Sequence, residues 1–549
     1  MLKKFRLKVF KKPLSLALFI ILVFSSAFFR FYRLGPLTTF LDDQGRDVLK
    51  AAQILKEGDV PFIGPMASIG NLYLGPIYYW AITPFLWFWH FNPVGPVILV
   101  ALLGLVTNLA LFLFVLNCFD LISAFLVSFL YALSPLVLQN SRFSWNPNPV
   151  PFFSLLWFWL LIEFLKKGKG KYFFGAGIAL GILIQLHYVT GILFVFTLAI
   201  YLYWLISSKK SFSRVDKVRP FLFLVAGIVL PLIPFILFEI KNCFINTRAA
   251  GDFIFGSNAN RGVDTSVFET FWILTSSLTN ELFTKFHFLV YYLLVVLFSP
   301  LLFLKKALPK QKWVIIFLPL IFLAAIFSCL LIIKGQIHLH YLGFLNSLVF
   351  LSIAAFTYFL RKQRLWLLAV FNILILVLLL VKMAVFDYQW IVKADNNQQI
   401  KRSQMVADYV AQKSKSKDIY LTSLTGSPYA YNYRYFLYIK GFATDSLKPS
   451  SVFAICEGAP CNPEGHPLWE IAQFGVLKTA SGEHVGYGVW VYELVKIKSQ
   501  KQRNIVTLLN CCMFHVACRI VKVVILVNRR LAARQRFWTS QNDGTSKSG

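Results

Sequence analysis

The chain has 549 residues, of which 57% are hydrophobic and 17% are aromatic, and its mean hydropathy is +0.64. These values exclude an ordinary soluble globular protein and predict a polytopic membrane protein. The formal charge of +31 comes from 55 basic and 24 acidic residues. Because the basic residues form short clusters between apolar runs, they indicate membrane orientation, and we expect no nucleic-acid partner.

The start of the chain predicts a retained membrane anchor. Lysines and arginines are dense within residues 1–12 and precede an apolar run, residues 14–29. A secretory signal peptide begins in a similar way, but Arg30-Phe31-Tyr32-Arg33 offers no small-residue cleavage site. We therefore expect a first span whose N-terminus lies in the cytoplasm.

Ten further apolar runs predict an all-α membrane region, residues 1–385, with about 11 transmembrane helices. Basic clusters recur at alternate connections, which the positive-inside rule places in the cytoplasm, so we expect a multi-pass protein of the plasma (inner) membrane with its C-terminal region outside. The aromatic run Ile77–Trp89 would invert every later loop if it crossed the membrane. We expect it to lie at the outer interface instead. The ten runs are 94–116, 121–138, 150–164, 172–186, 189–206, 221–238, 286–304, 313–333, 341–360 and 365–385.

The chain after residue 385 predicts a small extracytoplasmic α/β domain, residues 386–498. Helical spacing covers residues 398–413, and three later runs, 419–421, 452–455 and 489–492, are typical of strands. Cys456 and Cys461 are candidates for a disulfide in that oxidising location. Residues 499–549 form a tail to which we assign no role.

The acidic stretch after the first span is the most unusual feature of the sequence. Asp42, Asp43, Arg46 and Asp47 lie within six positions of one another. Charge so close to a bilayer is costly unless it faces water or a partner, so this stretch predicts a site. The alternative is a solvated loop in which Asp42 or Asp47 caps a short helix.

The other loops on the predicted outer face carry further polar and aromatic candidates. Convergence of such groups at one level is expected of a site that handles a polar group attached to a lipid, or of a transport path. Structural alternatives are that Arg142 snorkels to headgroups, that His187 is an interfacial hydrogen-bonding residue, and that Glu239 pairs with Lys241. The candidates are Tyr78, Arg142, Trp145, Asn146, His187, Glu239, His338, His340 and Tyr341.

Two histidines raise the question of a metal. His338 and His340 lie two positions apart, a spacing that suits a metal ion only on an extended segment, and no third ligand is evident. We expect no structural metal site and no cofactor, and the sequence leaves a divalent cation open.

The order of these motifs resembles that of a known family. The chain resembles the polyprenyl-phosphate-dependent glycosyltransferases of the GT-C fold, in particular the protein O-mannosyltransferases and lipid A aminoarabinose transferases of glycosyltransferase family 39. The resemblance covers roughly residues 14–495. It is carried by the acidic motif, by Gly75-Pro76-Ile77-Tyr78-Tyr79-Trp80, by the Ser141-Arg142 and Trp145-Asn146-Pro147 pieces of one loop, and by His340-Tyr341.

The resemblance implies a catalytic residue. In that family the first outer loop carries Asp-Glu, and the Asp is held to be the catalytic base or to orient the acceptor. Asp43 matches that Asp, with Gln44 where Glu is common, and Asp42 is the alternative if the register shifts by one. Acceptor recognition is the usual role suggested for the soluble domain.

The resemblance also implies a reaction and its partners. A monosaccharide would move from a polyprenyl-phosphate donor to a lipid, glycan or protein acceptor at the outer face, with inversion at the anomeric carbon, among surrounding membrane lipids. Asp43 would take the proton, and the leaving phosphate needs cationic or hydrogen-bonding groups. Arg46, Asp47 and the candidates above are expected to bind donor or acceptor.

A transporter or flippase of a lipid-linked or polar solute is the alternative function. Transporters usually place their ionisable residues near the bilayer midplane, on broken helices or inverted repeats. The spans here are nearly free of charge and show no internal repeat. We therefore favour the enzyme.

Overall fold

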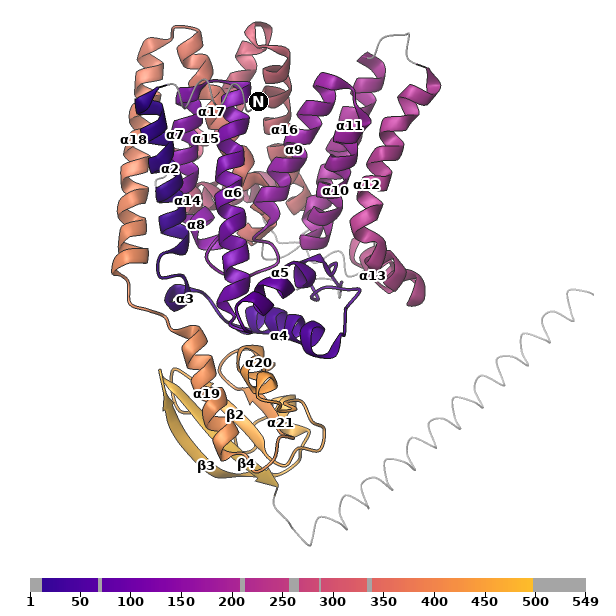
Figure 1. Ribbon diagram of the computed structural model, residues 1–549, viewed down its shortest axis with the longest axis vertical. Helices are drawn as coiled ribbons and strands as arrows, with labels where there is room; N and C mark the ends of the chain where they lie inside the picture. Colours follow the sequence, from indigo (N-terminus) through magenta and orange to yellow (C-terminus); the bar gives the residue numbers. More distant parts are fainter. Residues whose placement is uncertain are drawn as a thin grey trace, which may run out of the picture.

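The computed structural model describes residues 12–67, 72–207, 213–255, 266–285, 288–332 and 338–496. The basic N-terminal residues and the tail at 499–549 lie outside the described residues. Within them, the architecture is a helical bundle with a small sheet domain at one end (Figure 1).

The bundle confirms an all-α membrane region. Among the described residues, eight helical segments are long and apolar enough to cross a membrane, and α7 and α10 are apolar but shorter. Among the described residues the predicted apolar runs are mainly helical, because backbone groups in lipid must be satisfied within the segment. The run 121–138 is divided between α7 and α8. The number of 11 spans stays a prediction. The segments are α2 Pro13–Phe31, α6 Val94–Cys118, α7 Leu121–Ala132, α8 Pro135–Asn140, α9 Val150–Lys167, α10 Gly170–Leu186, η2 Tyr188–Gly191 with α11 Ile192–Ser207, α12 Arg214–Lys241, α15 Phe288–Phe298 with η4 Ser299–Lys306, α16 Pro309–Ile332, η5 Leu339–Leu345 with α17 Asn346–Lys362, and α18 Trp366–Asp387 with η6 Tyr388–Lys393.

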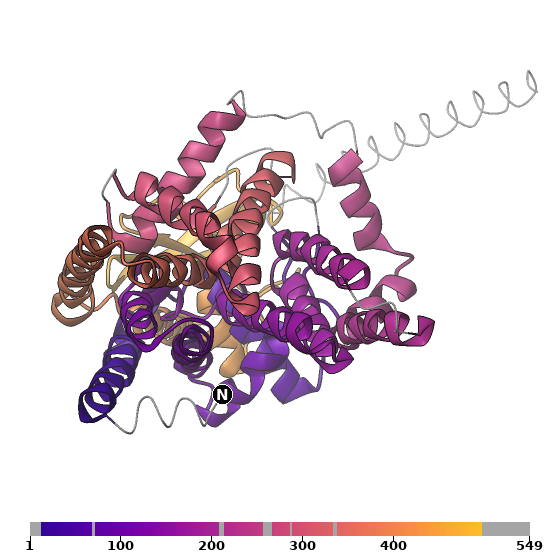
Figure 2. The same cartoon turned by 90° about the horizontal axis from the view of Figure 1, so that it is seen from above.

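The connections between α9 and α10 and between α17 and α18 lie at the end of the bundle opposite the sheet domain (Figure 1). Figure 2 shows the bundle from above, with the sheet domain behind the helices. At the end opposite the sheet domain, Arg361, at the end of α17, forms an ion pair with Asp120, which precedes α7. Lys310 donates a hydrogen bond to the carbonyl oxygen of Asn117. These contacts join three inter-helix connections at one face, as expected of loops that share one side of a membrane.

The opposite end of the bundle is closed by short helices, α3 Leu34–Leu37, α4 Asp42–Glu57 and α5 Ile77–Phe88, which lie across the ends of the long helices (Figure 1). The acidic stretch is therefore the first turn of a helix and not a loop. The α5 helix has 12 residues, about 18 Å of rise, and is too short to span a bilayer.

One predicted outer loop contains helices that sequence reasoning missed. Between α12 and α15 lie α13 Ile245–Phe255 and α14 Val267–Phe283. The hydroxyl of Ser266 caps α14 by accepting a hydrogen bond from the backbone N–H of Glu269 at 3.1 Å. Leu274, Leu278 and Leu282 are buried, so α14 packs into the bundle along one apolar stripe.

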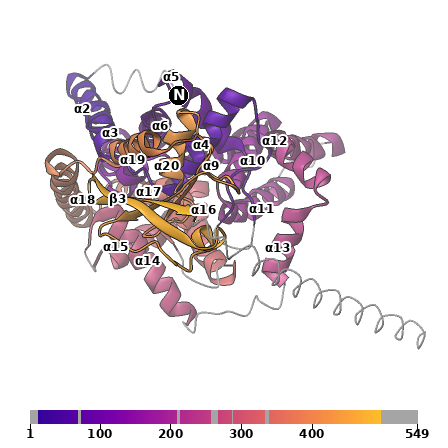
Figure 3. The ribbon, with the colours of Figure 1, turned by 90° about the horizontal axis from the view of Figure 1, so that it is seen from below.

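The C-terminal domain is the predicted α/β unit. Its four-stranded sheet has the order β1-β2-β4-β3, in which β1 and β2 are parallel and the other pairs are antiparallel. Sequence reasoning missed β3 and α20. Figure 3 shows the domain from below, with α19 and α20 near α4. Its elements are α19 Gln399–Lys413, β1 Tyr420–Ser423, α20 Tyr431–Ile439, β2 Val452–Glu457, α21 Trp469–Ala472, β3 Leu477–Gly486 and β4 Val489–Lys496.

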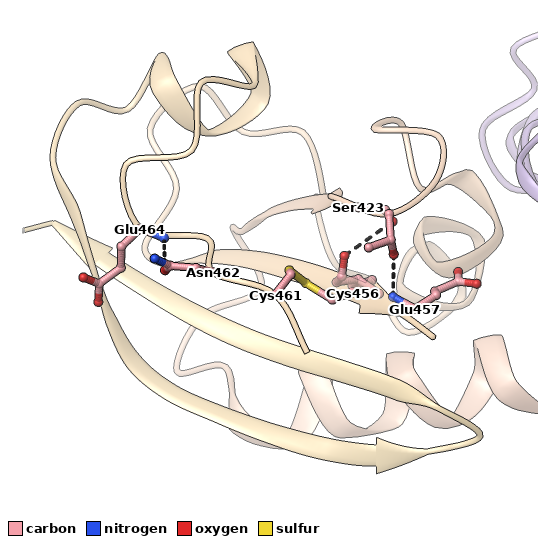
Figure 4. Close-up of a disulfide and its surroundings, with 8 residues drawn as sticks. Ser423, Cys456, Glu457, Cys461, Asn462 and Glu464 are labelled. Carbon is pink, nitrogen blue, oxygen red and sulfur yellow. Dashed lines mark hydrogen bonds between the residues drawn. A yellow bond between two sulfur atoms is a disulfide. The ribbon is translucent and has the colours of Figure 1, made fainter. Parts of the chain in front are cut away.

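The predicted disulfide between Cys456 and Cys461 is present and joins the end of β2 to the loop that follows it (Figure 4). Cys456 is fully buried. The cross-link therefore fixes the loop where it leaves the sheet.

A seam joins the two parts of the protein. The Arg33 guanidinium, just after α2, donates hydrogen bonds to the carbonyl oxygens of Val392 in η6 and of Ala394 just after it, both at 2.7 Å. The side-chain amide of Asn397 donates to the carbonyl oxygen of Thr38 at 3.1 Å. The entry to α4 is thus held by residues about 360 positions later.

Candidate active site

The end of the bundle that carries α4 and α5 contains a cavity of about 400 Å³, which we call the end cavity. It collects seven of the residues selected from the sequence, from segments far apart in the chain. Its size falls within the range of small-molecule sites. Its lining includes Asp43, Arg46, Trp145, Asn146, His187, His340 and Tyr341, together with Pro65, Met66, Ala67, Leu72, Leu74, Pro147, Tyr188, Val189, Phe235, Asn246, Thr247, Ala250 and Phe253.

The first turn of α4 supplies the charged edge of the end cavity. One guanidinium nitrogen of Arg46 lies 2.7 Å from Asp43 Oδ1, and another lies 2.8 Å from Asp47 Oδ1. Asp47 is fully buried, whereas the Asp43 side chain is 48% exposed. Burial raises the pKa of the Asp47 carboxyl to about 6, although Arg46 lowers it. Asp43 is therefore the carboxylate of this turn that a ligand in the cavity can reach.

Asp42, the alternative base, faces the C-terminal domain instead. Its carboxylate accepts hydrogen bonds from the Ser427 hydroxyl at 2.6 Å and from the backbone N–H of Tyr431 at 2.7 Å. Burial raises the pKa of Asp42, and those hydrogen bonds lower it by less. Asp42 does not line the end cavity, so geometry favours Asp43 between the two.

Histidine and aromatic rings form the opposite wall. The His340 ring lies 4.7 Å from the Trp145 ring and 5.5 Å from the His187 ring, between centroids. Burial, with a smaller contribution from His340, lowers the pKa of His187 to about 3, so His187 is neutral at pH 7. Its Nδ1 atom is buried without a hydrogen-bond partner among the described residues.

Asn146 and His338 flank this wall. The Asn146 side-chain amide donates to the carbonyl oxygen of Leu186 at 2.9 Å, which joins the loop after α8 to the end of α10. His338 is exposed and stacks on His340 at 5.5 Å. Within the described ranges, no group of three or more His, Cys, Asp or Glu residues could hold a metal ion.

The side of the cavity formed by α13 was missed from the sequence. Glu239 does not pair with Lys241 but accepts hydrogen bonds from the backbone N–H groups of Asn246 and Thr247, at 3.1 and 2.9 Å. These two residues line the cavity. The Asn246 side chain also accepts from the Tyr73 backbone N–H at 2.9 Å. Glu239 thus positions the cavity wall. A carboxylate is favourable near the N-terminus of a helix, so Glu239 was the residue in the sequence that could have indicated the start of α13.

Two other candidates lie outside the cavity. Arg142 is 2% exposed and donates hydrogen bonds to the carbonyl oxygens of Phe29 and Tyr32, so it does not snorkel to headgroups. Burial lowers its pKa to about 10, which leaves it charged at pH 7. The Tyr78 hydroxyl hydrogen-bonds to Ser144 at 2.6 Å and holds α5 against the loop after α8.

The architecture is similar to that of a protein of known structure. ArnT from Cupriavidus metallidurans, in a crystal structure bound to undecaprenyl phosphate, superposes with a TM-score of 0.53 at 13% identity, over 87% of this chain and 97% of that one. The chain has the GT-C glycosyltransferase fold. Residues 74–238 also match the sequence model of the family described as dolichyl-phosphate-mannose-protein mannosyltransferase.

Two other structures with the GT-C fold are similar at lower scores. The oligosaccharyltransferase of Archaeoglobus fulgidus has a TM-score of 0.49 at 13% identity, over 78% of this chain and 64% of that one. The mycobacterial arabinofuranosyltransferase AftD has a TM-score of 0.47 at 11% identity, over 87% of this chain and 41% of that one. No curated protein sequence matches the chain.

The GT-C fold and the family match support a membrane glycosyltransferase rather than a transporter. The matched residues include the motif at Gly75–Trp80, Trp145, Asn146 and His187. They exclude Asp43 and Arg46, whose place at the site therefore rests on the geometry of the end cavity.

Proposed function

We propose that the protein transfers a monosaccharide from a polyprenyl-phosphate donor to a hydroxyl group of a lipid, glycan or protein acceptor, at the outer face of the plasma membrane. The observation that supports this most directly is the end cavity, where the half-exposed Asp43 carboxylate and the Arg46 guanidinium adjoin an otherwise mainly apolar lining. A sugar phosphate attached to an isoprenoid chain likewise combines a charged polar group with an apolar chain.

The proposed reaction is an inverting displacement. The acceptor oxygen attacks the anomeric carbon and forms the new glycosidic bond, while the bond from that carbon to the phosphate oxygen breaks. The acceptor proton passes to Asp43, and polyprenyl phosphate leaves with the bonding electrons. Attack from the face opposite the phosphate inverts the configuration.

Arg46 is proposed to stabilise the leaving phosphate. Its guanidinium is held by Asp43 and Asp47, so its position is fixed before the donor binds. Preorganised positive charge in a partly dry site stabilises developing negative charge more than the same charge in water. With side chains in this role, the proposed reaction uses no resident cofactor.

The remaining lining is proposed to recognise the sugar and the first isoprenoid units. His187 lines the cavity and is proposed to contact the sugar, and the Trp145 ring offers an aromatic face. Leu74, Phe235 and Phe253 supply apolar contact.

Reconstitution tests the proposal. The full-length protein would be placed in liposomes with synthetic undecaprenyl-phosphate or dolichyl-phosphate monosaccharides and a membrane extract as the acceptor source. We expect release of polyprenyl phosphate and, by mass spectrometry, glycolipids or glycoproteins that are absent without the protein. Absence of both products with every donor would overturn the proposal.

A further inference from the structure

The helix that carries Asp43 and Arg46 packs directly on the C-terminal domain. The α4 and α20 helices are neighbours, although almost 400 residues separate them in the chain. This arrangement is visible in Figure 1, where α20 lies immediately below α4. Three independent features show how closely α20 is matched to α4.

The first feature is a contact between backbones. Gly45 lies against the backbone of Tyr431 and Asn432, and a Cβ atom at Gly45 would overlap the backbone nitrogen of Asn432. Because backbone atoms cannot rotate away as a side chain can, even one methyl group at residue 45 would push the two helices apart. Glycine is thus required at this position by the approach of α20.

The second feature is the hydrogen bonding of Asp42. Its two carboxylate oxygens accept from the Ser427 hydroxyl and from the Tyr431 N–H, at the start of α20. A carboxylate at a helix N-terminus is stabilised by the unpaired N–H groups there. Asp42 therefore joins the first residue of α4 to the first residue of α20.

The third feature is the aromatic packing before α4. The Phe40 ring lies 6.3 Å from the Tyr435 ring and 5.9 Å from the Phe436 ring, between centroids. The Phe40 backbone N–H donates to Gln399 Oε1 at 2.6 Å. The segment that leads into α4 is thus held by the same domain.

Neighbouring residues on a helix point about 100° apart, which separates the roles of two adjacent carboxylates. Asp42 faces α20, and Asp43 faces the end cavity. We propose that α20 is a positioning element that holds the first turn of α4 so that Asp43 and Arg46 face the bound sugar phosphate. This inference rests on the proposed function, and it gives the C-terminal domain a part in the reaction beside acceptor recognition.

Gly45→Ala in the full-length protein tests the proposal. Alanine favours a helix more than glycine does, so α4 itself should form at least as well, while the added methyl group displaces α20. We expect faster hydrogen–deuterium exchange in peptides covering residues 42–48, and a kcat lower by about 100-fold with little change in KM for an undecaprenyl-phosphate sugar.

Gly426→Ala is the matched control. It adds the same methyl group beside Ser427, but its Cβ would lie 3.7 Å from the nearest atom, Ser423 Oγ, in ordinary contact. Exchange at residues 42–48 and kcat should match the unmodified protein. Ser427→Ala and Ser427→Thr form a second pair, because threonine keeps the hydroxyl that Asp42 accepts from.

The outcomes distinguish positioning from general stability. An unchanged kcat in correctly folded Gly45→Ala, or equal losses in Ser427→Ala and Ser427→Thr, would overturn the proposal. If the unmodified protein transfers no sugar, the proposed function fails. Hydrogen–deuterium exchange at residues 42–48 still decides whether α20 holds α4. Unchanged exchange in both Gly45→Ala and Ser427→Ala would refute the role of α20.

Discussion

Arg46 donates two hydrogen bonds to Oδ1 of Asp47, at 2.8 and 3.0 Å, and Asp47 has no exposed surface. A buried carboxylate that loses its partner leaves an uncompensated charge, which is far more costly than the absence of the pair. Arg46, the residue proposed to bind the phosphate, is therefore also needed for the stability of α4.

The first prediction separates these two roles of Arg46. Arg46→Gln should abolish transfer and lower the free energy of unfolding by about 3 kcal/mol, because Asp47 is left unpaired. The double variant Arg46→Met with Asp47→Leu removes both charges and should regain most of the stability without regaining transfer. Thermal melting in detergent and a transfer assay measure both quantities. Recovery of transfer in the double variant would contradict the role of Arg46.

The second prediction concerns pH. Burial raises the pKa of Asp47 from 3.8 to about 6, so the folded state favours the protonated form. Its contribution to stability is present below pH 3.8 and is lost as the pH rises through about 6, a change of about 3 kcal/mol. Asp47→Asn should remove this dependence between pH 4 and 6. Melting curves of the two proteins across that range provide the measurement, and parallel curves would refute the assignment.

The third prediction is that Asp43 carries the proton transfer. Asp43→Asn keeps the shape and the hydrogen bond from Arg46 but removes the basicity, so kcat should fall by about 100- to 10,000-fold while the donor still binds. Asp59→Asn is the matched control, because Asp59 is an exposed carboxylate after α4 whose partner is Lys50. It should leave kcat unchanged. An equal loss of kcat in Asp43→Asn and Asp59→Asn would show that the loss comes from removing a negative charge and not from removing the proton acceptor.

The fourth prediction concerns the disulfide. In denaturant, where burial no longer protects a thiol, Cys456 and Cys461 should resist alkylation until a reductant is added, whereas the free thiol of Cys243 should react at once. Loss of the cross-link in Cys461→Ser should cost about 2 kcal/mol, the loop-closure value for so short a loop. Mass spectrometry of differentially alkylated peptides identifies the states, and early labelling of Cys456 would contradict the cross-link.

The fifth prediction concerns orientation. Lys169 lies at the basic connection between α9 and α10, and Trp469 is exposed on the C-terminal domain at the other end of the bundle. In a background that keeps Cys456 and Cys461 and has serine at the other six cysteines, Trp469→Cys should react with an impermeant maleimide on intact cells. Lys169→Cys should react only after permeabilisation. Reaction of Lys169→Cys on intact cells would contradict the predicted topology.

The helices of the bundle were predictable because lipid imposes one rule on every span. The exception is α14, which lies in a segment expected to be an outer loop. Its buried Leu274, Leu278 and Leu282 recur every four residues, which is the signal of one packed stripe. A helix that buries only one face among protein neighbours need not be apolar throughout.

The convergence of several candidate residues on one cavity was predictable from the sequence, but their hydrogen-bond partners were not. Trp145, His187 and His340 line one cavity because loops on one side of a membrane converge. Arg142 was misread, because the backbone carbonyl oxygens of Phe29 and Tyr32 that satisfy it leave no mark in the sequence. The same holds for Asp42, because no local pattern reveals its partners Ser427 and Tyr431.

The seam between Arg33 and the end of η6, at Val392 and Ala394, has a consequence for biosynthesis. The chain is made from its N-terminus, so Arg33 and α4 are synthesised and inserted long before the residues that hold them exist. Contacts between such distant segments form late, because a long loop must close first. Nascent chains that end before α20 should therefore carry Asp43 and Arg46 and yet be inactive, which would keep donor from being consumed on unfinished protein.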